Sequence, residues 1–154
     1  MARRRVVITG LGIVSPVGNT VEQAWQNIIA GRSGIERITR FDASSFPVQI
    51  AGEVRDFDVT KFLPAKDARR MDLFIHYGMA AGIQAIEDAG LEAHPANAEL
   101  IGVSIGSGIG GLPLIEHTRD EFIASGVRKI SPFFIPGSII NMISGNLSIL
   151  YGYK

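Results

Sequence analysis

The sequence predicts an α/β fold, and three features indicate it. An apolar run from Leu100 to Ile105 leads through four glycines to Pro113 and a helical pattern. The run from Val6 to Ile8 is apolar on both faces, as in a central strand that helices cover on both sides. Apolar residues recur at helical spacing between residues 66 and 90. A strand, a glycine turn and a helix in succession form the unit on which α/β proteins build their pockets.

The first third of the chain favours one strand and one helix before a less regular region. Residues 3–14 read as a strand that ends in a loop. Thr20 then caps a helix, with Gln23 as its capping-box partner, and Gly31 ends it. Further on, residues 48–54 alternate as a short, half-exposed strand, and residues 58–63 favour a short helix that stops before a proline.

The rest of the chain alternates helices with one strand and one loop. Residues 66–90 predict the longest helix, and the apolar run 100–105 predicts a buried strand. A further helix follows Pro113, which suits the first turn of a helix. Two prolines within residues 126–136 favour an ordered loop there. Residues 138–151 predict a helix that is apolar nearly all round, and such a helix must be buried or lie at an interface.

Bulk composition excludes several classes of function. The 154 residues are compatible with one domain, and a net charge of zero argues against a general nucleic-acid binder. No apolar run approaches the roughly 18 residues that cross a membrane, and none near the start suits a signal peptide, so we expect a cytoplasmic protein. Zero cysteines exclude disulfides, thiolate metal sites and a cysteine nucleophile within these residues. His76, His94 and His117 fall on separate predicted elements, which gives a metal site no support.

The glycine turn has three interpretations. Gly106, Gly108 and Gly111 match the G-x-G-x-x-G pattern of dinucleotide-binding proteins. That pattern needs an acidic residue at the end of the next strand, whereas Asp120 and Glu121 lie inside a predicted helix. A dinucleotide-binding module is therefore a remote alternative. The glycines also suit a turn needed only for packing, or a turn that a ligand approaches closely.

Two basic clusters interrupt the neutral balance of the chain. Lys66, Arg69 and Arg70 stand at the start of the predicted long helix, and Arg128 and Lys129 form a second pair. Positive charge at the start of a helix opposes the helix dipole. The clusters are either solvated faces or a docking site for an acidic partner, and the residues alone leave both interpretations open.

Together, these segments resemble the amino-terminal part of the type II β-ketoacyl-(acyl carrier protein) synthases, the condensing enzymes of the thiolase superfamily. The resemblance covers the whole chain in the family's order. It rests on six stretches of sequence, namely residues 4–12, 15–19, 31–35, 70–72, 106–111 and 129–134.

The resemblance implies the amino-terminal portion of the layered α/β/α/β/α thiolase-like fold, with residues 1–154 as an incomplete domain. It also implies a homodimer without a cofactor, which takes part in fatty acid biosynthesis. The implied reaction is a decarboxylating Claisen condensation of an acyl thioester with malonyl-loaded acyl carrier protein. A cysteine carries the acyl chain and two histidines assist, so the catalysis is covalent, with electrostatic stabilisation of an enolate-like transition state.

The resemblance also implies roles for particular residues. Ile109, within the turn formed by Gly106, Gly108, Gly110 and Gly111, matches the family's gate at the acyl pocket. Phe134 and Ile135 match residues that line the partner protomer's acyl pocket across the dimer interface. The basic residues match the surface that docks the acidic carrier protein; they are Lys66, Arg69, Arg70, Arg128 and Lys129.

The sequence departs from the family in its catalytic residues. The family's cysteine follows the helix that ends near Tyr151, and this chain has no cysteine. None of the three histidines matches a catalytic one, so we expect no catalytic residue here. Two hypotheses follow: an amino-terminal fragment that is inactive alone, or a short homologue that acts as a binding or scaffold partner. The apolar last helix favours the fragment, because alone it would lack its covering strands.

Overall fold

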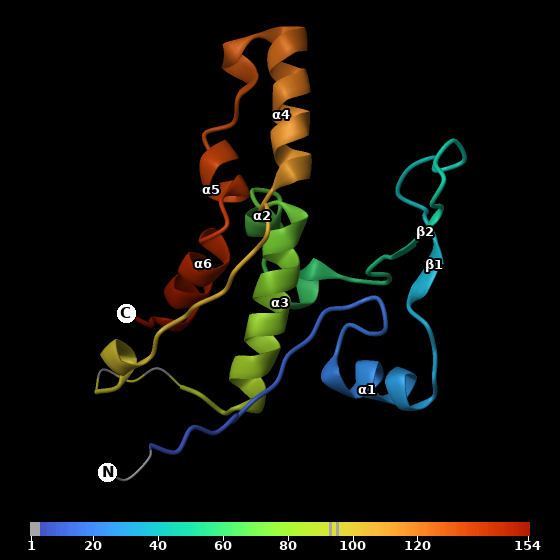
Figure 1. The fold of residues 1–154 in the computed structure, drawn as a ribbon. Helices are drawn as coiled ribbons and strands as arrows, with labels where there is room; N and C mark the ends of the chain where they lie inside the picture. Colours follow the sequence, from blue (N-terminus) through green and yellow to red (C-terminus); the bar gives the residue numbers. More distant parts are fainter. Residues whose placement is uncertain (1–3, 93, 95) are drawn as a thin grey trace.

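The computed structural model describes residues 4–92, 94 and 96–154. In chain order, its elements are α1 (Val21–Ile29), β1 (Ile35–Arg37), β2 (Ile50–Gly52), the 3₁₀ helix η1 (Val59–Lys61), α2 (Ala65–Ala68), α3 (Leu73–Asp88), η2 (Ala98–Leu100), α4 (Leu112–Ser125), η3 (Val127–Lys129), α5 (Phe134–Ser138) and α6 (Met142–Tyr151). Figure 1 shows α3 in the middle, α6 beside it, α4 and α5 beyond its upper end, and the β1–β2 hairpin to one side. Among the described residues, no helix combines the length and apolar character needed to span a bilayer.

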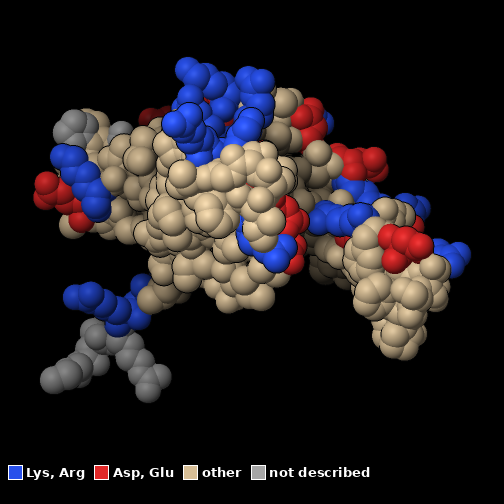
Figure 2. All heavy atoms as spheres, turned by 90° about the horizontal axis from the view of Figure 1, so that it is seen from above, with Lys and Arg blue, Asp and Glu red and all other residues tan. Residues whose placement is uncertain are grey.

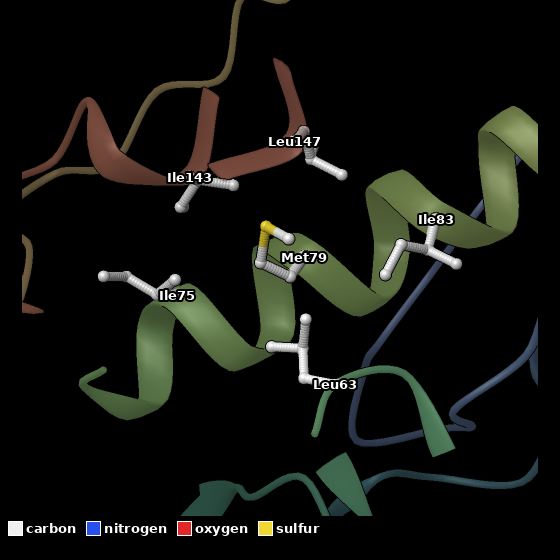
Figure 3. Packing of buried hydrophobic residues seen from close by; sticks show 6 residues of the cluster. All are labelled: Leu63, Ile75, Met79, Ile83, Ile143 and Leu147. Carbon is white, nitrogen blue, oxygen red and sulfur yellow. The ribbon is translucent and has the colours of Figure 1, made fainter. Parts of the chain in front are cut away.

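The core lies where α3 packs against α6. Its buried side chains pack between these two helices and the segment before α2 (Figure 3); they are Leu63, Ile75, Met79, Ile83, Ile143 and Leu147. A Cβ atom added at Gly78 would lie 2.6 Å from the Cδ1 atom of Ile143, and one at Gly82 would lie 2.5 Å from a Cδ1 atom of Leu147. The small residues of α3 therefore permit close approach, as the sequence predicted.

The predicted long helix is interrupted, so its expected start at residue 66 is wrong. Residues Ala65–Ala68 form the separate helix α2, and α3 begins only at Leu73. Asp72 makes the break because it takes an extended conformation and its carboxylate accepts a hydrogen bond from the Phe74 N–H at 3.3 Å. Aspartate is a preferred N-cap for this reason. The predicted end is confirmed, since Gly90 has the positive φ of 58° that suits a helix stop.

Helix α1 has the predicted N-cap. The Thr20 hydroxyl accepts a hydrogen bond from the Gln23 N–H at 3.2 Å. The Gln23 side chain reaches back to the N–H of Asn19, at 2.9 Å, one residue earlier than a standard capping box requires. Gly31 follows the helix with a φ of 65°, which confirms the predicted end.

The strand predicted within residues 48–54 is present as β2, and its partner β1 was not predicted. The two strands pair antiparallel, with Ile35 opposite Gly52. Glu53 ties the hairpin to the loop after β1, since its carboxylate accepts hydrogen bonds from the Thr39 hydroxyl at 2.7 Å and from the Thr39 and Arg40 N–H groups. The short helix predicted for residues 58–63 forms as η1, and the Asp58 carboxylate caps it at the Thr60 N–H.

The two predicted central strands are wrong as strands. Residues 4–14 and 101–106 are extended but pair with no other strand among the described residues, and Arg3 lies outside those residues. Val6 is 92% exposed and Leu100 is 84% exposed. An apolar run specifies burial, but a strand also needs a neighbour that pairs with its backbone groups.

Instead, the end of the first extended segment lies against α3, and the second extended segment lies against α6 and the core (Figure 1). The Leu11 N–H donates to the Asp88 carboxylate at 2.8 Å. A Cβ atom at Gly12 would lie only 1.9 Å from the backbone oxygen of Ala81. On the other side, the Ile105 N–H donates to the Ser144 hydroxyl at 3.0 Å, and Ile105 packs against the core.

The last third of the chain also differs in part from the prediction. Helix α4 forms as predicted, with Pro113 in its first turn. The expected loop 126–136 instead contains η3 and the start of α5. Pro136 is tolerated because it falls in the first turn of α5, where N–H groups have no partner within the helix. The helix predicted for residues 138–151 is therefore shorter and begins at Met142.

We expect Gly12→Ala to destabilise the protein by about 1–3 kcal/mol, because the added methyl group meets backbone that cannot yield. The matched control is Gly145→Ala in α6, where a Cβ atom meets only Met142 atoms at 3.8 Å or more. That substitution should stabilise the helix by about 0.5–1 kcal/mol. Denaturant unfolding followed by the fluorescence of Trp25 measures both effects. Equal stability of the two variants would show that residues 4–14 are not held against α3.

Glu53 of the hairpin should make the free energy of unfolding depend measurably on pH. Hydrogen bonds from Thr39, chiefly from its hydroxyl, lower the pKa of the Glu53 carboxyl. A lowered pKa in the folded state stabilises the protein above the unfolded value, and this stabilisation is lost as pH falls through the folded value. We therefore expect Glu53→Gln and Thr39→Val to flatten the loss of unfolding free energy below about pH 4.5, the ordinary value for glutamate. The measurement is the unfolding free energy at several pH values between about 3 and 7. If its slope against pH were the same in both variants as in the parent, the role of Glu53 would be contradicted.

Candidate functional site

The glycine turn is fixed at its carboxyl end and open at its beginning. No atom lies within 4 Å of a Cβ built at Gly106 or Gly108. Gly110 has a φ of 87°, and a Cβ atom there would meet the Ser138 backbone oxygen at 2.6 Å. The Gly111 N–H donates to that same oxygen at 2.9 Å. Within the described residues, packing therefore requires glycine at 110 and 111, and leaves the first half of the turn accessible.

A single carboxylate joins this turn to the beginning of α3. Asp72 is only 7% exposed, and one of its oxygens caps α3. The other oxygen accepts a hydrogen bond from the Leu114 N–H, in the first turn of α4, at 2.8 Å. The Asp72 N–H in turn donates to the Gly137 backbone oxygen in α5, at 3.1 Å. The sequence analysis missed this role, although the N-cap preference of aspartate was a signal that could have indicated it.

The three residues expected at an acyl pocket lie on two neighbouring segments. Ile109 is 69% exposed, Ile135 is 57% exposed, and Phe134 is half-buried. The hydrogen bond between Gly111 and Ser138 brings the segments together. None of the three side chains lines the apolar cavity described below. Ile109 and Ile135 therefore face solvent, and Phe134 does so in part.

The basic residues lie on two short helices and a turn, and all of their side chains are exposed. Lys66 is in α2, Arg69 and Arg70 follow it, and Arg128 and Lys129 are in η3. The expectation that the first cluster stands at the start of the long helix is wrong, because Asp72 begins α3. Figure 2 shows Lys and Arg side chains at several places on one face of the molecule, with the densest group at its upper edge.

An aromatic contact holds one of these cations in place. The guanidinium carbon of Arg70 lies 4.2 Å from the centroid of the Phe133 ring. Such cation–π contacts contribute about 0.5–1 kcal/mol at exposed sites. Because Phe133 follows η3 by only four residues, the contact links the turn that carries the first basic cluster to the segment that carries the second.

Arg70 and Phe133 also line an apolar cavity of about 500 Å³ that the sequence analysis did not find. Methionine and aliphatic side chains from α3, α6 and the turn before α3 form most of its wall, and Asp67 and Arg70 stand among the lining residues. No local sequence signal marks it, because its lining comes from four separate segments. Its apolar lining residues are Leu63, Pro64, Met71, Met79, Phe133, Pro136, Met142, Ile149 and Leu150.

The histidines have no metal-binding arrangement. Among the described residues, no group of three or more histidine, aspartate or glutamate side chains is placed to hold a metal ion. The His76 Nε2 atom is 2.8 Å from the Ala68 backbone oxygen, so this side chain links α3 to α2. His117 lies 3.6 Å from Glu121 on the exposed side of α4.

Two stacked tyrosines close the carboxyl end of the core. The rings of Tyr151 and Tyr153 lie 5.6 Å apart, and burial raises the pKa of both hydroxyls. Both hydroxyls are therefore protonated at neutral pH. The Tyr153 hydroxyl donates to the Leu91 backbone oxygen at 3.3 Å, which fixes the chain end beside the end of α3.

Comparison with known proteins gives this arrangement a family. The family described as "Beta-ketoacyl synthase, N-terminal domain" matches residues 3–154. The chain belongs to the β-ketoacyl synthase family. It is 59% identical over 154 residues to "3-oxoacyl-[acyl-carrier-protein] synthase 2" of Coxiella burnetii, and 57% identical to the protein of the same name from Vibrio cholerae. In each case the whole chain is covered but only 37% of the relative, so the chain spans little more than a third of these relatives.

Solved structures give the same family and the fold. A type II PKS ketosynthase, bound to the hexaketide and in complex with its acyl-carrier protein, matches with a TM-score of 0.79 at 27% identity. The match covers 99% of this chain and 41% of the other. This confirms the predicted class, the amino-terminal portion of the thiolase-like α/β fold.

Membership of the ketoacyl synthase family also argues against the dinucleotide-binding interpretation of the glycine turn. The family match includes residues 106–111, so the turn belongs to a condensing-enzyme fold and the dinucleotide alternative loses its basis. The stretches that carried the resemblance in the sequence all lie within the matched residues. The individual roles of Ile109, Phe134, Ile135 and the basic residues remain predictions.

Proposed function

We propose that residues 1–154 form the amino-terminal part of a type II 3-oxoacyl-(acyl carrier protein) synthase, as an incomplete thiolase-like domain. The observation that carries the proposal is identity of 56–59% along the whole chain to relatives that bear this name. The complete protein then catalyses the decarboxylating condensation of an acyl thioester with malonyl-loaded carrier protein in fatty acid biosynthesis, in the cytoplasm.

The proposed chemistry needs a nucleophile that these residues do not supply, since none of the 154 is a cysteine. In the proposed reaction, a cysteine thiolate displaces the carrier-protein thiol from the acyl group and forms a thioester. The malonyl unit loses carbon dioxide, and its carbanion attacks the thioester carbonyl. The tetrahedral intermediate then expels the cysteine thiolate and leaves a new carbon–carbon bond. The reaction as written needs no cofactor. Its two steps, acyl transfer and condensation, share the cysteine thioester as their covalent intermediate.

The contribution of residues 1–154 is recognition. The exposed basic residues of α2, its turn and η3 are suited to an acidic carrier protein, because charge complementarity speeds encounter and sets orientation. In this proposal Ile109 gates the acyl chain at the accessible part of the glycine turn. Phe134 and Ile135 reach the acyl pocket of a second protomer across a homodimer interface. The exposed apolar residues Ile149 and Leu150 of α6 support such further burial.

A second candidate is a binding or scaffold protein without catalysis, and the absence of cysteine favours it. Both candidates keep the docking surface, but only the first makes product once the missing residues are supplied. A chimaera tests this difference, with residues 1–154 joined to the part of the Vibrio cholerae relative that lies beyond the match.

We expect residues 1–154 alone to form no carbon–carbon bond, and the chimaera to condense acyl- and malonyl-loaded carrier proteins. Mass spectrometry of the 3-oxoacyl product measures this. The control is the chimaera with its nucleophilic cysteine replaced by alanine, which should be inactive. Product from residues 1–154 alone would refute the proposed division of labour. A folded but inactive chimaera that still binds carrier protein would favour the scaffold.

The docking surface predicts a salt-dependent effect of charge. Exposed ion pairs contribute about 0–1 kcal/mol each, so the double reversal Arg69→Glu with Arg128→Glu should weaken carrier-protein binding far more than either single change. The effect should shrink with salt, because the screening length falls from about 10 Å at 0.1 M to about 3 Å at 1 M. Affinity of the chimaera for carrier protein, at low and high salt, measures this.

The matched control is Arg32→Glu with Arg37→Glu, an equal change of charge near α1 and β1. It should leave affinity close to that of the parent. If both double reversals weaken binding equally, only net charge matters. If neither does, the basic clusters are solvated faces.

A further inference from the structure

We propose that Asp72 is a positioning residue that fixes the glycine turn, and with it Ile109, relative to the turn that carries Arg69 and Arg70. This inference rests on the proposed function for the meaning of the two turns. The contacts of Asp72 stand independently of that function. They link docking residues that meet the carrier protein to a gate that meets the acyl chain.

The geometry uses both oxygens of one buried carboxylate. One oxygen accepts from the Phe74 N–H at 3.3 Å and the other from the Leu114 N–H at 2.8 Å, across 42 residues of sequence. Gly111 is packed into the same place: a Cβ atom there would lie 3.0 Å from the Asp72 Cβ atom. The glycine turn therefore ends in direct contact with the side chain that begins α3.

A carboxylate is needed here because α4 has no cap of its own. Gly111 occupies the N-cap position of α4 and has no side chain to accept a hydrogen bond. Helix N-termini leave N–H groups without partners, and Asp72 supplies the acceptor from another helix. Its negative charge also suits the positive ends of both helix dipoles. A serine has one oxygen and a shorter reach, so it can cap α3 but cannot also reach Leu114.

The turn that carries Arg69 and Arg70 is thus coupled to the glycine turn through a short path. Arg70 lies two residues before Asp72, and its guanidinium group is held against Phe133. The backbone N–H of Asp72 is bonded to Gly137 in α5, whose next residue accepts the hydrogen bond from Gly111. A shift of the Arg69–Arg70 turn on docking therefore moves Asp72, and Asp72 moves the end of the turn that carries Ile109.

The test uses the chimaera with Asp72→Ser, which keeps the α3 cap, and with the isosteric Asp72→Asn, which has one acceptor oxygen. The control Asp58→Ser replaces a carboxylate that caps η1 through hydrogen bonds from Thr60. Three quantities are measured. The first is the ratio of kcat/KM for carrier protein loaded with a long acyl chain to that for a short one. The others are the affinity for carrier protein and the rates of amide hydrogen exchange at Phe74 and Leu114.

We expect Asp72→Ser to change the chain-length ratio by about tenfold, the scale expected for losing one hydrogen bond to a charged group. Exchange at Leu114 should speed up while Phe74 stays protected, and affinity for carrier protein should hold. Asp58→Ser should leave the ratio unchanged. Asp72→Asn should act in the same direction, and it decides the matter if the serine variant does not fold.

Faster exchange at Leu114 with an unchanged chain-length ratio would overturn the proposal and leave Asp72 a structural cap. An equal loss of kcat/KM for both acyl chains would overturn it too, since that pattern reports general damage. Failure of the proposed function looks different, because the chimaera without any substitution at Asp72 would then make no product.

Discussion

The arrangement of α3 and α4 depends on the hydrogen bonds that one buried carboxylate, that of Asp72, accepts. Buried polar groups are costly unless they are hydrogen-bonded, and a buried charge is more costly still. Asp72 meets this constraint with N–H donors from two helices, α3 and α4. Both donors lie at helix N-termini, where such groups lack partners within the helix. The same residue therefore ends the turn that carries Arg69 and Arg70, begins the central helix and contacts the first turn of α4.

Close packing around α3 makes the second constraint. Gly78 and Gly82 admit the side chains of Ile143 and Leu147 from α6, and Gly12 lies against the backbone of Ala81 on another side. Interiors packed this tightly transmit small displacements, because side chains have little free volume to absorb them. The basic clusters and the glycine turn are attached to the end of this rigid unit. Their relative placement is consequently set by packing, by the hydrogen bonds of Asp72 and by the contact between Arg70 and Phe133.

Local signals in the sequence predicted the features that local physics decides. The Thr20 cap, the stops at Gly31 and Gly90, and the helix after Pro113 all follow from backbone chemistry within a few residues, and the structure has them. The break at Asp72 was missed because apolar spacing runs straight through it from Met71 to Phe74. Spacing identifies a face, and only the capping geometry shows where the helix begins.

Features decided by distant contacts could not be predicted in this way. The cavity beside Arg70 is built from four segments, and the contact between Arg70 and Phe133 joins residues that no local pattern relates. The resemblance to a family supplied the candidate site residues, since nothing in the spacing of Ile109 or Phe134 marks an acyl pocket. Conversely, the apolar pattern at Val6 and Leu100 predicted strands that pair with no other strand among the described residues.

That last difference itself carries an argument. The first predicted strand is apolar on both faces, from Val6 to Ile8, a pattern found where helices cover both sides of a sheet. In the structure, Val6 is 92% exposed and Ile8 is 83% exposed. Leu100, at the start of the second predicted strand, is 84% exposed, whereas Val103 and Ile105 pack against the core. Selection for apolar residues at exposed positions makes sense when further protein covers them, and the relatives of this chain are nearly three times as long as the part it matches. The pattern at Val6 and Leu100 therefore supports the hypothesis of an amino-terminal fragment, because a free-standing scaffold would leave these apolar side chains exposed.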